Sequence, residues 1–171
     1  KISKKINYDL VLAKVITKSI TVSRTKPSLI HIGSSAEYIP LRKRLSTKES
    51  TNCYPVSRYG KNKLEVSNYL LKKCKENNIN LIICRLFNVI GKDPKKETIL
   101  GKIFFHLKND KGSVPLKLET LSAYRDYVDV RDVSRGIWLC IKYISKRKNV
   151  REVFNFGSGK AIKMSHLVER I

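Results

Sequence analysis

A nearly unbroken apolar run, INLIICRLFNVIG at residues 79–91, is the feature that most constrains how this chain folds. Continuous apolar runs are typical of strands buried on both faces of a parallel sheet, whereas half-exposed strands alternate apolar and polar residues. Parallel strands cannot be joined by tight hairpins and need crossover connections, which are usually helical. The run therefore predicts a sheet that is covered by helices on both sides.

Helical periodicity occurs on both sides of this run. Apolar residues recur at three- and four-residue spacing in several segments, and a β-branched run, SLIHIGSS, ends in a Gly-Ser-Ser loop. We predict helices at 6–23, 58–77, 97–109 and 130–145 and from Ser165 onward, and strands at 28–35, 79–91 and 152–157. This alternation of helices and strands predicts an α/β fold with a parallel sheet.

The chain is strongly basic, with 36 Lys and Arg against 14 Asp and Glu and a net charge of +22 over 171 residues. Such a balance suits a polyanion, either a nucleic acid or an anionic membrane surface. The basic residues are scattered, however, and Lys, Asn and Ile are all over-used, which favours a composition bias. We therefore expect no specific nucleic acid partner.

Neither a signal peptide nor an apolar run near 18 residues occurs, so we expect no membrane association and a reduced, cytoplasmic setting. The four cysteines lie far apart, without a Cys-x-x-Cys motif or a His at ligand spacing, so no metal site is predicted. Three of them sit in apolar patterns and are expected to be buried free thiols: Cys74, Cys84 and Cys140.

Two Tyr-Lys pairs with helical i, i+4 spacing lie in one segment, Tyr59 with Lys63 and Tyr69 with Lys73. A nearby ammonium favours the phenolate and makes a Tyr a better proton donor near neutral pH. Tyr69 lies in mid-helix next to two leucines, which indicates packing. Tyr59 lies at the helix start, where a side chain can project into a cleft at the strand ends.

A pair of hydroxyl residues, Ser34 and Ser35, ends the strand before this helix. In a parallel sheet this strand end and the start of the next helix meet at the same edge. A Ser, a Tyr and a Lys placed together supply a carbonyl-binding hydroxyl, a proton donor and a charge that tunes the donor. The alternative is that both serines are ordinary turn residues.

Five motifs now identify a resemblance. HIGSSAEY, YPVSRYGKNKLEVSNYL, ICRLFNVIG, YRDYVDVRDVSRGIWL and VFNFGSGKAIKMSHL occur in this order and span nearly the whole chain. Together they resemble the extended short-chain dehydrogenase/reductases, the NAD-dependent epimerase/dehydratase family. Within it, GSSAEY and RDYVDVRDVSRGIW are most similar to the branch of GDP-4-keto-6-deoxy-mannose reductases.

The resemblance implies part of a Rossmann-like, doubly wound parallel sheet and part of a small C-terminal substrate-binding lobe. Residues 1–92 would belong to the NAD(P)-binding domain. Residues 93–171 would form the lobe, with a returning sheet strand near 127–130 and 152–157. The family's glycine-rich phosphate loop has no counterpart in this sequence, and we expect it to precede residue 1 in a longer protein.

The resemblance also implies roles for individual residues. Tyr59 would be the general acid/base, Ser35 would hydrogen-bond the sugar carbonyl or hydroxyl, and Lys63 would hold the nicotinamide ribose. Further residues would contact the cofactor (Tyr59 itself, Leu86, Phe87 and Asn88) or the nucleotide sugar (Ser34, Ser35, Asn88 and Arg125).

Simpler interpretations stay open for several of these residues. Asn88 could cap a turn. Arg125 and Asp126 could form a surface ion pair of little energetic value. Asp129 could cap the helix that follows it. Arg85 lies inside the apolar run and needs partners if it is buried, as part of either the sheet edge or the site.

These implications lead to two expectations of different classes. The first is an enzyme, a nucleotide-sugar 4-reductase, epimerase or dehydratase that exchanges hydride with NADP or NAD. It would bind a nucleotide-diphosphate sugar, and it is compatible with a homodimer through the Tyr59-Lys63 helix. The alternative is a truncated, non-catalytic family member that serves as a binding or scaffold protein. It is supported by the missing glycine-rich loop and the charge of +22.

Overall fold

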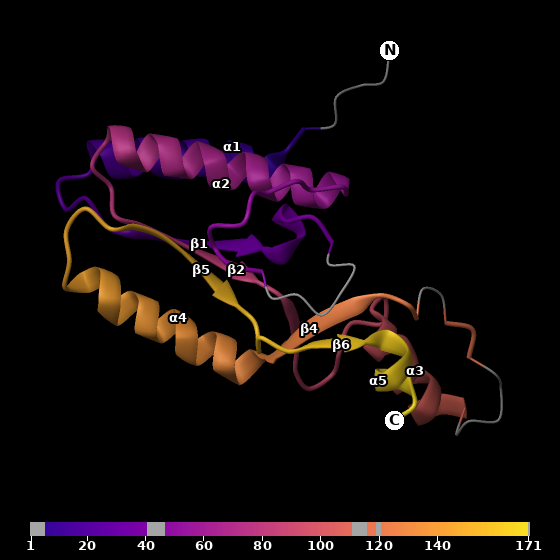
Figure 1. The fold of residues 1–171 in the computed structure, drawn as a ribbon. Helices are drawn as coiled ribbons and strands as arrows, with labels where there is room; N and C mark the ends of the chain where they lie inside the picture. Colours follow the sequence, from indigo (N-terminus) through magenta and orange to yellow (C-terminus); the bar gives the residue numbers. More distant parts are fainter. Residues whose placement is uncertain (1–5, 41–46, 111–115, 119–120, 171) are drawn as a thin grey trace, which may run out of the picture.

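A computed structural model describes residues 6–40, 47–110, 116–118 and 121–170. Its main sheet contains three parallel strands in the order β1-β2-β5 (Figure 1). These are β1 (Leu29–Ser34), β2 (Leu81–Leu86) and β5 (Arg151–Phe156). The α/β fold with a parallel sheet, predicted from the sequence, is confirmed.

The central strand β2 explains why the apolar run is continuous. Leu81 and Ile83 belong to a hydrophobic cluster on one face of the sheet, and Ile82 and Cys84 belong to a second cluster on the other face. All four side chains are completely buried. Since successive residues of a strand point to opposite faces, a strand covered on both sides must be apolar at every position.

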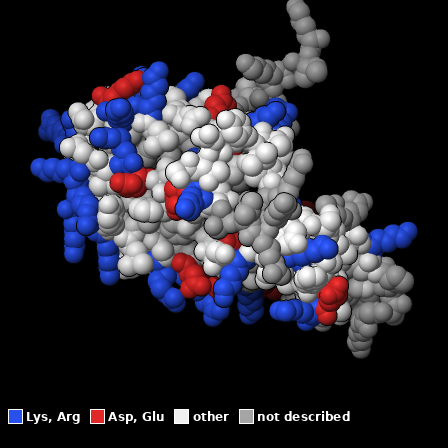
Figure 2. All heavy atoms as spheres, viewed as in Figure 1, with Lys and Arg blue, Asp and Glu red and all other residues white. Residues whose placement is uncertain are grey.

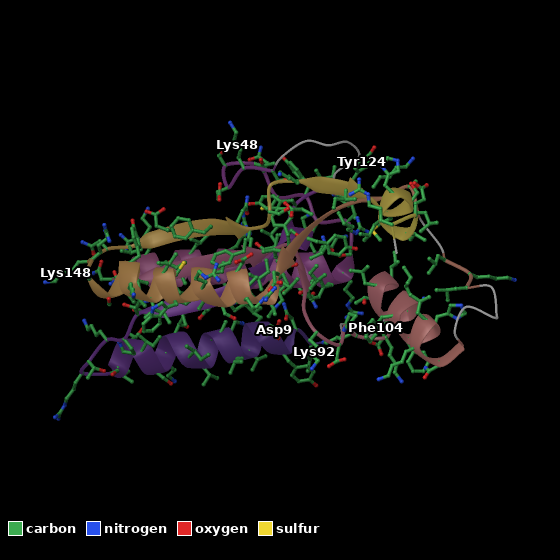
Figure 3. All side chains as sticks on the ribbon, turned by 90° about the horizontal axis from the view of Figure 1, so that it is seen from below. Asp9, Lys48, Lys92, Phe104, Tyr124 and Lys148 are labelled. Carbon is green, nitrogen blue, oxygen red and sulfur yellow. The ribbon has the colours of Figure 1, made fainter. Side chains whose placement is uncertain are left out.

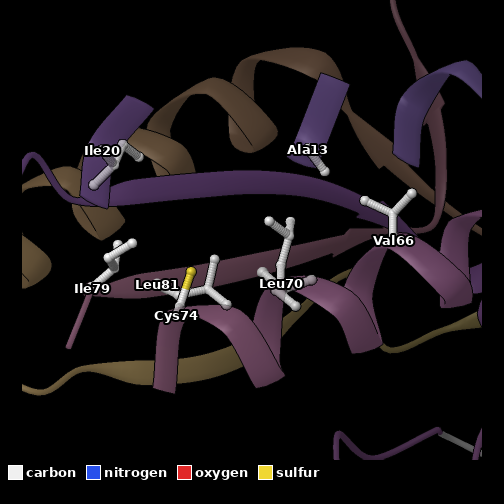
Figure 4. Close-up of a cluster of buried hydrophobic side chains, with 8 residues drawn as sticks. Ala13, Ile20, Val66, Leu70, Cys74, Ile79 and Leu81 are labelled. Atoms are coloured by element: carbon white, nitrogen blue, oxygen red, sulfur yellow. The ribbon is translucent and has the colours of Figure 1, made fainter. Parts of the chain in front are cut away.

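Two helices, α1 (Tyr8–Val22) and α2 (Arg58–Glu76), lie side by side over the first face of the sheet (Figure 1). Ala13 and Ile20 from α1 meet Leu70 and Cys74 from α2 above Leu81 of β2 (Figure 4). Each helix begins at a polar cap: the side chain of Asn7 accepts a hydrogen bond from the backbone of α1, and Ser57 does the same for α2. The first layer is therefore a pair of amphipathic helices.

The opposite face is covered by α4 (Val130–Ser145), which packs Cys140 and Ile144 against β2. Asp129 begins this helix by accepting a hydrogen bond from the amide of Arg131 at 2.7 Å, and the Arg131 guanidinium also binds the same carboxylate. These hydrogen bonds lower the pKa of Asp129 to about 2. The cap that the sequence suggested for Asp129 is present.

A second, smaller sheet follows the carboxyl end of β2. It consists of β3 (Asn88–Ile90), parallel to β4 (Tyr124–Asp129), with β6 (Ala161–Lys163) antiparallel to β4. The helices α3 (Ile99–Asp110) and α5 (Met164–Val168) lie beside it (Figure 1). Residues 152–156 therefore lie in the main sheet, and residues 127–129 lie in the second sheet. One short 3-10 turn, η1 (Ser35–Glu37), links β1 to the loop that follows.

Lys and Arg cover much of the visible surface (Figure 2). They are densest on the side of the molecule where α2 and α4 have their C-termini (Figure 2). Cys74, Cys84 and Cys140 are buried free thiols, as predicted. Within the part of the chain that the structure describes, every helix is too short or too polar to span a bilayer.

Candidate functional site

Tyr59 lies in the first turn of α2, directly after the Ser57 cap, whose hydroxyl accepts a hydrogen bond from the amide of Gly60 at 3.0 Å. The Tyr59 side chain is 57% exposed, so its hydroxyl is free to meet a ligand. One turn later, the Lys63 ammonium lies 5.9 Å from the centre of the Tyr59 ring. The predicted pair is therefore on one helix face, with Tyr59 accessible.

Lys63 also binds the neighbouring helix. Its ammonium donates a hydrogen bond to the carboxylate of Asp9 at 3.0 Å. The Lys63 side chain is 18% exposed and that of Asp9 is 56% exposed. Asp9 lies at the end of α1 that points toward the second sheet, away from Lys148 (Figure 3). This ion pair fixes the direction of the ammonium while leaving two of its three donors for other partners.

The Ser35 turn is pressed against the start of α2. Gly60 allows this contact, because a Cβ at that position would lie 2.1 Å from the carbonyl oxygen of Ala36. Ser34 is buried and structural, since its hydroxyl caps η1 by accepting a hydrogen bond from the amide of Ala36 at 3.2 Å. Ser35, one residue later, lines a cavity. The close packing at Gly60 therefore brings the Ser35 turn next to the Tyr59 helix start.

The cavity at Ser35 has a volume of about 320 Å³. It is also lined by Phe87, Asn88 and Arg125, three other residues predicted for the site. Four of the predicted residues, from three separate segments of the chain, thus meet at the carboxyl end of the main sheet.

Lys63 lines a different hollow of about 240 Å³, between α1 and the edge strand β1. His31 lines it as well, and burial, with the nearby Lys63 charge, lowers the pKa of this His. The two cavities have no lining residue in common, so the predicted set is divided between them. Tyr59 is among the lining residues of neither.

The residues predicted to contact the cofactor at the end of β2 lie in two different environments. Leu86 is partly buried and packs against the hydrophobic cluster under α4, so it shapes the strand end from the side of the core. Phe87 leaves the sheet, with its amide bound to the carbonyl of Phe156 at 2.9 Å, and lines the 320 Å³ cavity. Phe87 and Asn88 are therefore the residues of this segment that a ligand in that cavity can reach.

Asn88 and Arg125 lie between the 320 Å³ cavity and a larger one of about 820 Å³. The side chain of Asn88 donates a hydrogen bond to the carbonyl of Asp126 at 2.9 Å, which joins β3 to β4. The larger cavity is also lined by Lys92 and Lys95. Arg125, Lys92 and Lys95 outnumber the two carboxylates of the same lining, Asp93 and Glu97, so this opening suits a phosphorylated ligand.

Asp126 is buried, which rules out the simple surface ion pair considered from the sequence. Its carboxylate accepts hydrogen bonds from the amide and hydroxyl of Ser158, at 2.8 and 2.7 Å, and from the amide of Gly159 at 2.9 Å. These bonds tie the Gly-rich turn after β5 to β4. Asp126 is thus a structural residue of the cavity wall.

The second Tyr-Lys pair on α2 is engaged in packing, as predicted. The Tyr69 hydroxyl lies 3.2 Å from that of Thr17 on α1, and the ring packs against the core. The ammonium of Lys73 donates to the carboxylate of Glu76 at 2.7 Å. The two pairs share their spacing, and both Lys residues bind a carboxylate, but Tyr59 is exposed whereas Tyr69 packs against the core.

Sequence reasoning missed a buried ion pair behind the Ser35 turn. Arg85 on β2 donates to the carboxylate of Glu37 at 2.9 Å, with 6% and 0% of the two side chains exposed. Arg85 also donates to the hydroxyl of Tyr38 at 2.7 Å. Burial raises the pKa of Tyr38, although Arg85 opposes the shift. The only signal in the sequence was a charged residue inside an apolar run.

No cluster of three or more His, Cys, Asp or Glu side chains suited to a metal ion occurs in the described ranges. The residues that this structure offers for a ligand are instead a hydroxyl-bearing turn, an accessible phenol, an ammonium and several guanidinium or ammonium groups near one cavity.

Comparison with known proteins matches residues 2–157 to the model of the NAD dependent epimerase/dehydratase family. Among curated relatives, the dTDP-6-deoxy-L-talose 4-dehydrogenase (NAD(P)(+)) of Kitasatospora kifunensis is 27% identical over 164 residues, which cover 94% of this chain and 50% of the relative. The dTDP-4-dehydro-6-deoxyglucose reductase of Escherichia coli is 26% identical over 118 residues, 68% of this chain and 36% of the relative.

Solved structures share the fold. UDP-glucuronic acid 4-epimerase from Bacillus cereus, in complex with UDP-glucuronic acid and NAD, superposes with a TM-score of 0.80 at 20% identity, over 94% of this chain and 49% of that one. dTDP-glucose 4,6-dehydratase from Bacillus anthracis, in complex with NAD, gives 0.77 at 22% identity, over 95% and 49%. This chain therefore spans about half the length of the proteins it matches.

Proposed function

The chain belongs to the NAD-dependent epimerase/dehydratase family, and from that premise we propose that it carries the Ser-Tyr-Lys part of a nucleotide-sugar oxidoreductase. The observation that supports this most directly is the close contact at Gly60, which sets the Ser35 turn against the start of the Tyr59 helix. Only a glycine permits this approach of the turn to the helix, which supports a shared role for Ser35 and Tyr59.

Each residue then has a chemical task. Ser35 donates a hydrogen bond to the sugar oxygen at the reacting carbon and so polarises a carbonyl there. Tyr59 transfers a proton to or from the same oxygen. Lys63, held by Asp9, directs its remaining donors to the nicotinamide ribose. Bound NADP or NAD supplies or accepts the hydride.

The cofactor fits one part of this chain. Lys63 lies one turn after Tyr59 on α2 and would hold the nicotinamide ribose. The cofactor phosphates need a glycine-rich loop, which these 171 residues do not contain. We therefore assign only the nicotinamide end of the cofactor site to these residues and expect activity from the complete enzyme.

The substrate we propose is a nucleotide-diphosphate sugar. The sugar would occupy the 320 Å³ cavity at Ser35, Phe87 and Asn88. The diphosphate would lie at Arg125, with Lys92 and Lys95 in the larger cavity providing further positive charge. Asn88 and Arg125 line both cavities, so one extended ligand could occupy both.

Among the reactions of this family, we favour reduction of a 4-keto-6-deoxy sugar. Reduction and epimerisation need only hydride transfer and the Tyr59 proton, whereas elimination of water needs a further acid and base. Of the described residues that line the 320 Å³ cavity, Asp126 is the one carboxylate, and it is bound to the Ser158 turn. The two curated relatives named above, which act on dTDP-6-deoxy sugars, support the same choice.

The test is turnover by the complete enzyme. With NADPH and either dTDP-4-dehydro-6-deoxyglucose or the corresponding GDP-4-keto-6-deoxymannose, absorbance at 340 nm should fall with enzyme-dependent kinetics. Nucleotide sugars should also raise the melting temperature of the protein in proportion to their affinity. If the complete enzyme shows neither turnover nor a thermal shift with any nucleotide sugar, the result favours the non-catalytic alternative.

A homodimer through α2 belongs to the same proposal. Val11 and Val15 on the neighbouring helix α1 are 50% and 57% exposed, which leaves apolar surface beside α2. Light scattering of the purified protein should give the mass of two chains, and a charged residue at Val15 should shift it toward one.

A further inference from the structure

The buried ion pair of Glu37 and Arg85 is the centre of a larger polar network that the proposed reaction does not use. Arg85 donates to Glu37 through Nε and to the Tyr38 hydroxyl through Nη1, and its guanidinium lies 4.7 Å from the Tyr38 ring centre. A planar guanidinium can bind both partners at once, and a Lys ammonium cannot reproduce this geometry. The network therefore depends on Arg at this position.

One arm of the network shapes the Ser35 turn. The second carboxylate oxygen of Glu37 accepts a hydrogen bond from the amide of Ser34 at 2.9 Å. Gly33 leaves room for this carboxylate, because a Cβ there would lie 2.7 Å from the same oxygen. The Glu37 carboxylate thus holds the two ends of the turn together, with Ser35 between them.

The other arm reaches the far wall of the cavity. The Tyr38 hydroxyl donates to the side-chain oxygen of Asn155 on β5 at 2.9 Å. The side-chain nitrogen of Asn155 donates to the carbonyl of Thr47 at 2.8 Å, and its backbone amide donates to the carboxylate of Glu49 at 2.9 Å. Tyr38 and Thr47 both line the 320 Å³ cavity.

We propose that Asn155 is a positioning residue for substrate binding: with Arg85, Glu37 and Tyr38 it sets the distance between the Ser35 turn and the 47–49 wall of the sugar cavity. The proposal rests on the proposed function for the identity of the ligand. The network itself joins four segments that are distant in sequence, at β1, β2, β5 and the 47–49 segment. The centre of the network, at Arg85, Glu37 and Tyr38, is buried, and Asn155 is partly buried; an unpaired group at the centre would be costly, which favours one geometry.

The test variant is Asn155→Leu, which keeps the branching of the side chain at Cγ and removes both side-chain hydrogen bonds. Its matched control is Asn80→Leu. Asn80 also joins distant segments, donating to the carbonyl of Arg147 at 3.0 Å and accepting from the amide of Val150 at 3.0 Å, but at the opposite end of the sheet. A second test variant, Tyr38→Phe, removes only the linking hydroxyl and retains the ring.

The first measurement is amide hydrogen exchange, which needs no substrate. The amides of Lys48 and Thr51 are hydrogen-bonded within the wall segment. Asn155→Leu and Tyr38→Phe should speed their exchange about tenfold, and Asn80→Leu should instead speed exchange at Val150. Unchanged exchange at Lys48 and Thr51 in both test variants would overturn the proposal.

The second measurement separates positioning from general stability. In the complete enzyme, Asn155→Leu should raise KM for the nucleotide sugar about tenfold and leave kcat within about a factor of two, because it loosens binding rather than chemistry. Asn80→Leu should change neither. Equal effects of the two variants on KM would contradict the proposal. If the unaltered enzyme turns over no nucleotide sugar, the proposed function fails while hydrogen exchange still decides the network.

Discussion

The two halves of α2 carry the same Tyr-x-x-x-Lys spacing in opposite surroundings. At the start of the helix, Tyr59 is exposed and Lys63 borders a hollow beside the edge strand. Toward its end, Tyr69 packs on Thr17, and Lys73 is bound to Glu76 of its own helix, whereas Lys63 is bound to Asp9 of the neighbouring helix α1. The comparison teaches that spacing places two side chains on one face, whereas the elements packed around them decide whether that face meets a ligand.

The largest expected difference between the halves is in turnover. In the complete enzyme, Tyr59→Phe should lower kcat by roughly 10²- to 10⁴-fold, because it removes the proton donor. Tyr69→Phe should leave kcat within about twofold, since that hydroxyl only contacts Thr17. NADPH oxidation measures both. A Tyr59→Phe enzyme with near-native rates would refute the assignment of the first pair.

A second difference concerns stability at small residues of the same helix. Gly60→Ala should lower the free energy of unfolding by roughly 3 kcal/mol, because the new Cβ would collide with the Ala36 carbonyl. Ser67→Ala, in the second half, should be neutral or slightly stabilising. Ser67 is fully buried, and its hydroxyl has no hydrogen-bond partner among the described residues.

Urea denaturation of the two variants measures this difference. Equal destabilisation by Gly60→Ala and Ser67→Ala would mean that the start of α2 is no more tightly constrained than its buried second half.

The buried end of α2 also has a pH dependence of its own. Burial raises the pKa of the Cys74 thiol from 9.0 to about 11. The folded state therefore retains this proton between about pH 9 and 11 while the unfolded state releases it. The contribution of this thiol to the free energy of unfolding is fully present below pH 9. It falls by about 2 kcal/mol as the pH rises toward 11.

The measurement is the unfolding free energy of the unaltered chain and of Cys74→Ala across this window. The variant should lose stability less steeply with rising pH. Parallel curves would show that Cys74 does not report on the burial of this part of the helix.

The smallest expected effect is that of Tyr69→Phe on folding. Loss of the hydrogen bond to Thr17 should cost about 1 kcal/mol, the usual value for a partly buried pair. A double-mutant cycle with Thr17→Val would isolate the interaction between the two side chains. A coupling energy of zero would mean that apolar packing alone, without the hydrogen bond to Thr17, holds Tyr69 in place.

Much of the fold could be predicted because its signals are local. The run at β2, the periodicity of α1, α2 and α4 and the Asp129 cap all depend on neighbours within a few residues. The candidate site is harder to predict, because its residues come from segments that lie far apart in the sequence. Nothing near Asn155 in the sequence indicates that its amide holds Thr47, 108 residues away.

The sequence by itself determined the α/β architecture and the double-sided burial of β2, and it supplied the prediction of Tyr59 over Tyr69, because periodicity and position relative to a helix start are encoded locally. Only the tertiary structure decided that Ser34 caps a turn while Ser35 lines the cavity, that Leu86 packs against the core, and that Arg85 is bound to Glu37. The physical reason is that burial and hydrogen-bond partners are properties of packed neighbours, and packing at the sheet edge joins residues that the chain keeps far apart.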